Sequence, residues 1–184
     1  MYRSRKKSLH HNRKKERITN MNRSIDPQNK IMTLAEAVEW REKMRIAGKR
    51  VSITNGCFDL LHRGHAEYLK AAAELADVLV VLINSDESVR ELKGPTRPVN
   101  CEYDRAYLLA CFAFIDAVVV FNGKRCTKEL DALAPDAYAK GGDYTIETLD
   151  PEEREALFNA GAEISFIPFV PDHSTTKLIE KAKG

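Results

Sequence analysis

The stretch that decides the fold is Thr54-Asn55-Gly56-Cys57-Phe58-Asp59-Leu60-Leu61-His62-Arg63-Gly64-His65. It begins at the end of a short β-branched run, residues 51–54, which predicts a strand. A helix of about a dozen residues is expected to begin at His62 or Gly64 and to run through Leu75. A strand, a glycine-containing turn and a helix in direct succession indicate the first unit of an α/β sheet.

Two histidines at the start of this helix indicate what the turn can bind. His62 and His65 stand at positions i and i+3, which lie on one face of a helix. Gly64 between them lets a phosphate approach the backbone closely, and a helix N-terminus offers free N–H groups and a partial positive charge. The pattern predicts a pocket for an anion whose charge grows during a reaction, whereas a lone histidine would more often be structural.

Other ligands fit this stretch less well. Neither GxGxxG nor GxxxxGK[ST] follows the first strand, which argues against an ordinary NAD domain and against a P-loop kinase. Zinc binding by His62 and His65 would need a third ligand, for which Asp59 is the only near candidate in the sequence. The four cysteines form no CxxC pair, so we expect no metal centre built from protein side chains.

Outward from this unit, strands and helices alternate along the chain. Thr33 and Glu36 have the spacing of a capping box, which predicts a helix that ends near Gly48. Further strands are expected at 78–83, 118–121, 136–140 and 164–167, and further helices at 103–114, 127–134, 151–160 and 175–183. The alternation predicts an open, Rossmann-like, doubly wound parallel α/β sheet of about five strands.

The loops that follow the strands are the informative ones, because ligands of such sheets bind at the carboxyl ends of the strands. Besides 54–65, these loops are 84–100, 121–127, 140–148 and 168–176. The segment 84–100 is expected to be a polar loop, in which Lys93 offers a point charge and Arg97 a bidentate donor to a phosphate. Arg105, on the next helix, is a weaker phosphate candidate, and a surface salt bridge is an equal alternative for it.

Two later loops also have features that suit a nucleotide. Lys140-Gly141-Gly142-Asp143 ends a strand, and its glycines permit close approach of adenine or ribose, although Asp143 could instead cap a turn. Ser174-Thr175-Thr176 places hydroxyl and N–H groups at the start of the last helix, which suits β- and γ-phosphates or an ordinary N-cap.

Basic residues are concentrated at the N-terminus. Residues 1–30 hold ten Lys/Arg and two Asp/Glu, a balance of +8 in a chain of 184 residues and net charge +2, which leaves −6 for the remainder. We expect 1–30 to be a disordered extension, too poor in aromatic residues to favour nucleic-acid binding, and 31–184 to be one domain. The sequence has no secretory signal and no apolar run near the roughly 18–20 residues of a membrane helix, so a cytoplasmic protein with reduced thiols is expected.

These motifs resemble a known family when they are taken together. Asn55-Gly56-Cys57-Phe58-Asp59 with His62-Arg63-Gly64-His65 is similar to the nucleotidyltransferase superfamily marked by the HxGH signature. Segments 84–86, 92–100, 140–144 and 174–177 narrow the resemblance to the D-glycero-β-D-manno-heptose 1-phosphate adenylyltransferases. These occur alone or as the C-terminal half of a bifunctional heptose kinase/adenylyltransferase, and the resemblance covers about residues 32–182.

The resemblance implies transfer of AMP from ATP to heptose 1-phosphate, giving ADP-heptose and pyrophosphate without a covalent intermediate. The catalytic residues would be His62, His65 and Lys93, and the substrate phosphate would be held by Lys93, Arg97 and Arg105. Asp59 would orient a group or touch Mg²⁺, which is expected to be carried by the ATP phosphates. The nucleotide would contact Asn55, Gly56, Cys57, Phe58, Asp59, His62, Gly64, His65, Asn84, Asp86, Lys140, Gly141, Gly142, Asp143, Ser174, Thr175 and Thr176.

Two features depart from the family pattern. Phe121-Asn122-Gly123-Lys124-Arg125-Cys126-Thr127 is basic where an acidic Asp-Thr-Pro segment is expected, which leaves the acceptor sugar open. The basic extension lies outside the pattern, and no kinase domain is recognisable ahead of it, so a separate heptose kinase is expected in the same pathway. The resemblance also suggests a homodimer, for which the helix at 103–114 is a candidate contact.

Two alternative functions stay open. A cytidylyltransferase that uses CTP and glycerol 3-phosphate, or a related alcohol phosphate, would share the HxGH signature, and the choice of base depends on backbone contacts that a sequence hides. A non-catalytic nucleotide-binding or nucleic-acid-binding protein would show no turnover, and its binding would be salt-sensitive and depend on residues 1–30.

Overall fold

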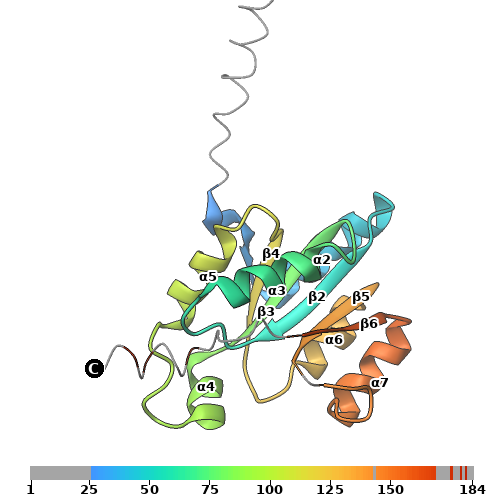
Figure 1. Ribbon diagram of the computed structural model, residues 1–184. Helices are drawn as coiled ribbons and strands as arrows, with labels where there is room; N and C mark the ends of the chain where they lie inside the picture. Colours follow the sequence, from blue (N-terminus) through green and yellow to red (C-terminus); the bar gives the residue numbers. More distant parts are fainter. Residues whose placement is uncertain (1–25, 143, 169–174, 176–178, 180, 182–184) are drawn as a thin grey trace, which may run out of the picture.

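The structure, a computed structural model, describes residues 26–142, 144–168, 175, 179 and 181. Six strands in this part of the chain form one sheet in the order β1-β4-β3-β2-β5-β6, and paired strands run parallel (Figure 1). The predicted open, doubly wound parallel α/β sheet is therefore confirmed. The strand that the sequence did not predict is β1, which has two residues and is too short for a periodic pattern to reveal.

The helices and strands have the following bounds. The strands are β1 (Ile31–Met32), β2 (Val51–Gly56), β3 (Val78–Asn84), β4 (Ala117–Phe121), β5 (Ala137–Gly141) and β6 (Glu163–Ile167). The helices are η1 (Pro27–Lys30, a 3₁₀ helix), α2 (Leu34–Ile46), α3 (Arg63–Ala73), α4 (Asp86–Lys93), α5 (Glu102–Ala110), α6 (Thr127–Leu133) and α7 (Pro151–Ala160).

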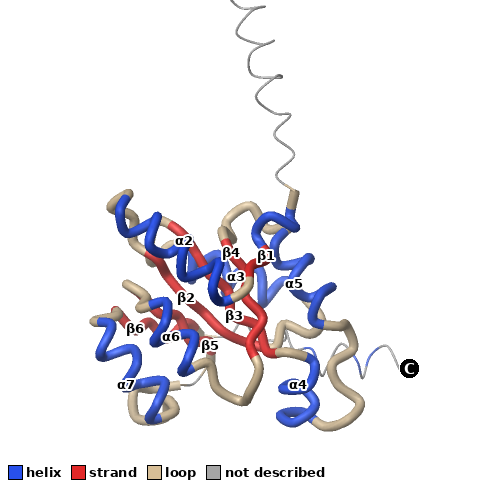
Figure 2. Tube along the Cα trace, turned by 180° about the vertical axis from the view of Figure 1, so that it is seen from behind, coloured by secondary structure: helices blue, strands red, loops and turns tan. Residues whose placement is uncertain are grey.

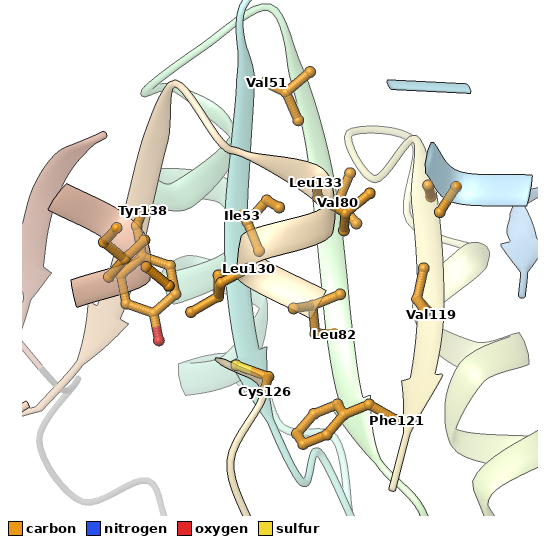
Figure 3. Close-up of a cluster of buried hydrophobic side chains, with 14 of the residues drawn as sticks. Val51, Ile53, Val80, Leu82, Val119, Phe121, Cys126, Leu130, Leu133 and Tyr138 are labelled. Carbon is orange, nitrogen blue, oxygen red and sulfur yellow. The ribbon is translucent and has the colours of Figure 1, made fainter. Parts of the chain in front are cut away.

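Helices cover both faces of the sheet, as Figure 2 shows from behind. Every residue of β3 is buried, because a parallel strand in the middle of such a sheet has no solvent face. Its side chains alternate: Val80 and Leu82 pack in the cluster under α2, α6 and α7 (Figure 3), whereas Val81 and Ile83 pack under α3 and α5. The two clusters fix the positions of the strand ends. The loops at the carboxyl edge of the sheet therefore begin from fixed positions.

Two helix termini follow the sequence signals closely. The Thr33 side chain accepts from the backbone of Glu36 at 3.3 Å, and the Glu36 carboxylate accepts from the backbone of Thr33 at 2.8 Å, which confirms the capping box. Helix α7 begins after Asp150, which caps it, and ends at Gly161, whose φ of 69° is the left-handed conformation that favours glycine.

The order of the strands locates the place where a ligand can enter. The chain proceeds from β2 to β3 to β4 in one direction and then returns to β5 on the other side of β2. The crevice between the carboxyl ends of β2 and β5 is therefore the topological switch point, where open α/β sheets bind their ligands. Asn55 and Gly56 end β2 at this crevice, and Lys140 and Gly141 end β5.

The segment 84–100 is not one polar loop, so that prediction was wrong. Residues 86–93 form α4, which Ser85 caps by accepting from the Ser88 backbone at 3.2 Å. Only Ser88 and Val89 of this helix are buried, and eight mostly polar residues give too few apolar positions for a helical period. The signals were present in the cap, in the acidic first turn and in the basic last turn.

The chain ends are described only in part. Asp26 caps η1, Lys30 donates to the Phe112 carbonyl at 2.9 Å, and the Tyr103 hydroxyl donates to Gln28 at 2.8 Å, so residues 26–30 pack against the domain. The predicted extension falls mainly on residues 1–25, outside the described part, and most of the predicted helix at 175–183 does too. Among the described residues, none of the helices has the length and apolar character needed to cross a bilayer.

Candidate active site

The turn after β2 is shaped by Phe58. Phe58 is buried and has a φ of 46°, which turns the chain sharply behind the strand. Its ring lies over Gly56, where a Cβ would sit 3.0 Å from a ring carbon, so a larger residue at this position would push the ring aside by a few tenths of an ångström. The same ring meets the His65 imidazole edge-on with 5.4 Å between centroids. Phe58 and Gly56, both predicted nucleotide contacts, therefore shape the turn that carries the histidines.

The two histidines lie together at the start of α3. His62 is the N-cap, and its Nδ1 accepts from the His65 backbone at 3.4 Å. The two rings stack with centroids 3.9 Å apart and planes inclined by 20°. Because Nδ1 of His62 acts as an acceptor, Nε2 is the donor nitrogen of its neutral ring. The spacing predicted that these side chains share a face, and the structure shows them in contact.

The electrostatic environment keeps His65 uncharged. Burial is the main cause that lowers its pKa to about 4. Unfavourable electrostatic interaction with His62 and with the Lys93 ammonium lowers the pKa further, and a hydrogen bond with the Leu60 backbone opposes these effects. The Nδ1 atom of His65 is buried and has no hydrogen-bond partner among the described residues. A buried nitrogen in this situation is expected to meet a ligand or a water molecule. His65 therefore presents an uncharged imidazole at the start of α3.

The shifted pKa of His65 predicts a pH dependence of stability. Between its ordinary value of 6.5 and its folded value of about 4, the unfolded chain binds a proton that the folded chain does not. The free energy of unfolding should therefore have its full His65 contribution above about pH 6.5 and lose it as the pH falls toward 4. Urea unfolding of wild type and His65→Gln at several pH values checks this, because the difference between the two curves isolates His65. A difference that stays constant with pH would contradict the assignment.

Asp59 connects the HxGH turn, residues 57–65, to the segment that follows α4. Its carboxylate accepts from Arg97 Nε at 2.5 Å, from the Val99 backbone at 2.7 Å and from the Asn100 backbone at 3.1 Å. Burial raises the pKa of Asp59, but the donors Asn100, Arg97 and Val99 outweigh it and lower the pKa overall. Of the two roles expected for Asp59, orientation of another group is the one that these bonds support.

Lys93 and Arg97 are brought to the same place by α4 and the chain that follows it. Lys93 is the last residue of α4 and is exposed, and its charge lowers the pKa of both His65 and Cys57. Arg97 is held through Nε by Asp59, and its Nη2 is buried without a hydrogen-bond partner among the described residues. The Cys57 thiol lies within the field of both cations, although burial is the main cause that raises its pKa.

Arg105 does not lie where a phosphate ligand should. It is fully buried, and its guanidinium donates to the Asn100 carbonyl at 3.0 Å, to the Cys57 carbonyl at 2.7 Å and to the Asp86 carboxylate at 2.8 Å. The structure therefore corrects both alternatives for Arg105, since it is neither exposed to a phosphate nor part of a surface salt bridge. Asp86, a predicted nucleotide contact, is engaged by the same guanidinium.

Asn84 is also committed to contacts within the protein. Its amide nitrogen donates to Ser88 at 2.8 Å and to the Gly123 carbonyl at 3.3 Å, and its oxygen lies 3.7 Å from the Cys57 sulfur. Only 4% of Asn84 is exposed, which leaves it little surface for a nucleotide. Asn84 therefore holds the basic loop 122–125 against α4, and its direct contact with a nucleotide is not supported by these bonds.

The later motifs are placed at the same edge of the sheet. Lys140 and Gly141 end β5 at the switch point, and Gly142 donates to the Ile167 carbonyl at 2.9 Å. Thr175 donates from its hydroxyl to the Leu60 carbonyl at 3.3 Å, which places Thr175 against the turn that carries the HxGH motif. Asp143, Ser174 and Thr176 lie outside the described residues, so their predicted roles stay predictions.

Two residues of the site were not found from the sequence, Tyr138 and Glu153. The Tyr138 hydroxyl donates to Asn55 at 2.7 Å, and the buried Glu153 carboxylate lies 3.6 Å from the Lys140 ammonium. A tyrosine in a buried strand needs a partner for its hydroxyl, which was an available signal. Glu153 lies in a helix whose sequence resembles that of an ordinary surface helix, and no local pattern marks it. In the described ranges, no group of three His, Cys, Asp or Glu side chains is placed to hold a metal ion.

Comparison with known proteins agrees with this geometry. Residues 53–181 match the cytidylyltransferase-like family. The chain belongs to this family. It is 44% identical over 154 residues to the bifunctional protein HldE of Koribacter versatilis, covering 84% of this chain and 31% of that protein. It is also 44% identical over 158 residues to HldE of Methylococcus capsulatus, covering 86% of this chain and 33% of that protein.

The chain spans about a third of the length of these curated relatives. Among solved structures, it resembles the lipopolysaccharide core biosynthesis protein of Thermoplasma volcanium with a TM-score of 0.55 and 26% identity. That similarity covers 67% of this chain and 98% of the other chain. The predicted resemblance to nucleotidyltransferases is confirmed by this family membership.

Proposed function

We propose that the chain transfers AMP from ATP to D-glycero-β-D-manno-heptose 1-phosphate, giving ADP-heptose and pyrophosphate. The observation that carries the proposal is the stacked His62–His65 pair at the N-terminus of α3, beside the switch point and within the field of Lys93. Similarity to HldE proteins and to a lipopolysaccharide core biosynthesis protein supports a sugar phosphate as the acceptor.

The proposed phosphoryl transfer uses an anion site that is preorganised in the free protein. An oxygen of the sugar phosphate attacks the α-phosphorus of ATP, the bond to the β-phosphate oxygen breaks, and pyrophosphate leaves with that electron pair. Negative charge on the phosphoryl oxygens is stabilised by N–H donors of His62 and His65 and by the Lys93 ammonium. These groups act through position and charge, and none of them needs to become covalently attached.

Arg97 is proposed to line the phosphate pocket together with His62, His65 and Lys93. Asp59 holds one edge of the guanidinium through Nε, which leaves the Nη edge to face a phosphate. The buried Nη2 without a partner is the atom that this arrangement presents. A fixed arginine loses less side-chain freedom on binding than one on a mobile loop would, which favours tight positioning of the acceptor or of the pyrophosphate.

The proposal extends to the metal and to the partners. The Asp59 carboxylate is occupied by Arg97, Val99 and Asn100, so we propose that ATP enters as its magnesium complex, with the ion held mainly by the phosphate oxygens. A sugar kinase activity would supply the phosphorylated heptose. A homodimer is proposed through α5, where Tyr103, Tyr107 and Leu108 are exposed by 55%, 37% and 45%.

The test is a substrate panel with pyrophosphate release as the signal. ATP and CTP are each offered with heptose 1-phosphate and with glycerol 3-phosphate, in the presence of Mg²⁺. We expect turnover with ATP and heptose 1-phosphate at least about tenfold above the other three pairs, because the base and the acceptor are each selected by separate contacts. Turnover with CTP and glycerol 3-phosphate alone would replace this proposal by a cytidylyltransferase, and no turnover with any pair would indicate a binding protein.

A further inference from the structure

Asn55 is held from one side by β5. Its side-chain oxygen accepts from the Tyr138 hydroxyl at 2.7 Å and from the Lys140 ammonium at 3.0 Å. The same ammonium lies 3.1 Å from the Tyr138 hydroxyl oxygen, so the three polar groups close a triangle. This triangle spans the two strands whose carboxyl ends form the switch point.

The chemistry of the three groups determines how the Asn55 carboxamide is turned. A lysine ammonium can only donate hydrogen bonds, so the atom of Asn55 that faces it must be the oxygen. Tyr138 accepts from Lys140 and donates to the same oxygen, which gives each of the three bonds one direction. The amide nitrogen of Asn55 must therefore point away from the Tyr138 hydroxyl and the Lys140 ammonium.

The ammonium of Lys140 is itself fixed by α7. Its side chain is only 14% exposed, and Glu153, whose side chain is 3% exposed, places a carboxylate oxygen at 3.6 Å. The other oxygen of Glu153 accepts from the Cys126 backbone at 3.1 Å, so the carboxylate cannot turn away. The Tyr144 ring, 5.3 Å from the ammonium, covers it from another side. A buried charge is therefore neutralised and held in one place.

We propose that Tyr138, Lys140 and Glu153 are positioning residues that hold the Asn55 amide nitrogen ready to donate to the phosphates of the bound nucleotide. This inference rests on the proposed function, and it gives Lys140 a role different from direct nucleotide binding. The amide needs support because a free carboxamide would turn either face to the phosphates, and its oxygen would repel them. The three supporting residues act only through Asn55, which makes the proposal separable from a direct role.

A double-mutant cycle tests whether Tyr138 acts through Asn55. The affinity for magnesium ATP is measured by calorimetry for wild type, Tyr138→Phe, Asn55→Ala and the double variant, together with the KM for each substrate and kcat. We expect Tyr138→Phe alone to weaken ATP binding about five- to tenfold, the usual effect of one lost hydrogen bond. In the Asn55→Ala background the same change should have no effect on ATP binding, and the KM for the acceptor should stay unchanged in both.

Tyr68→Phe is the matched control. Its hydroxyl is also buried in the sheet region, but it bonds to Thr54 and to the Ala139 carbonyl at 3.0 Å and does not touch Asn55. It should lower the thermal midpoint without changing the affinity for ATP. Glu153→Gln provides a second perturbation if Tyr138→Phe does not fold, and it should weaken ATP binding in the same direction. Equal losses from Tyr138→Phe in both backgrounds would overturn the proposal.

The outcome is distinguishable from failure of the proposed function. The cycle measures nucleotide binding without an acceptor, so a wrong acceptor does not affect it. If CTP binds and ATP does not, the adenylyl assignment fails, and the same four variants are titrated with magnesium CTP. The positioning role is then supported if Tyr138→Phe weakens CTP binding in the wild-type background and has no effect on it in the Asn55→Ala background.

Discussion

His65→Ala is expected to lower kcat about 10²- to 10³-fold, with a much smaller change in the KM for ATP. In the proposed mechanism the N–H of His65 donates to charge that develops on the phosphoryl group, so its loss should be felt mainly in the transition state. The neutral state of His65 sharpens the expectation, because a pKa of about 4 excludes a permanent imidazolium as the source of stabilisation at neutral pH. The measurement is steady-state pyrophosphate release at saturating ATP and acceptor.

His65→Gln is the informative companion variant. Glutamine keeps an uncharged N–H donor of similar reach, so part of the lost kcat should return if His65 acts as a neutral donor. The Phe58 ring loses its edge-on partner in both variants, which controls for packing around the turn. A wild-type kcat for His65→Ala would remove His65 from the mechanism. Equal losses for Ala and Gln, with unchanged thermal midpoints, would indicate that the imidazole ring itself is required.

The fold was predictable wherever a local signal was strong. The capping box of Thr33 and Glu36 marked α2, and the apolar run of β3 marked a strand covered on both faces. The HxGH stretch marked the start of α3, because a β-branched strand, a glycine-containing turn and two histidines at helical spacing follow one another directly. These are contacts within one turn or one strand, which a sequence displays directly.

The sequence predicted where in the fold the candidate site lies, but it did not predict which side chains contact one another there. Asp59, Lys93 and Arg97 were expected in the site, yet the bonds by which Asp59 holds Arg97 join residues 38 positions apart. The family resemblance assigned Asn84 to the nucleotide, whereas its amide is used within the protein. A polar residue at a strand end can face a ligand or support a neighbour, and only the partner across the sheet decides between the two.

Arg105 was likewise expected at a phosphate, and its partners lie in three separate segments that its own sequence neighbours do not reveal. Arg105→Met should lower the free energy of unfolding by about 3–5 kcal/mol, the cost of breaking a buried ion pair from one side. Methionine fills similar space but leaves the carbonyls of Cys57 and Asn100 without their donor and Asp86 without its cation. Urea unfolding at neutral pH measures the loss. Arg45→Met is the matched control, because its pair with Glu42 is exposed to solvent and should contribute little to the free energy of unfolding.

The activity of Arg105→Met separates the two roles that Arg105 could have. As an internal support, Arg105 fixes the Cys57 turn against Asn100, so its loss should reduce kcat and raise both KM values together while the protein becomes less stable. A phosphate ligand would instead raise the KM of one substrate and leave the free energy of unfolding nearly unchanged. The bonds of the guanidinium to three separate segments favour the first outcome, since one side chain here joins the HxGH turn, α4 and the start of α5.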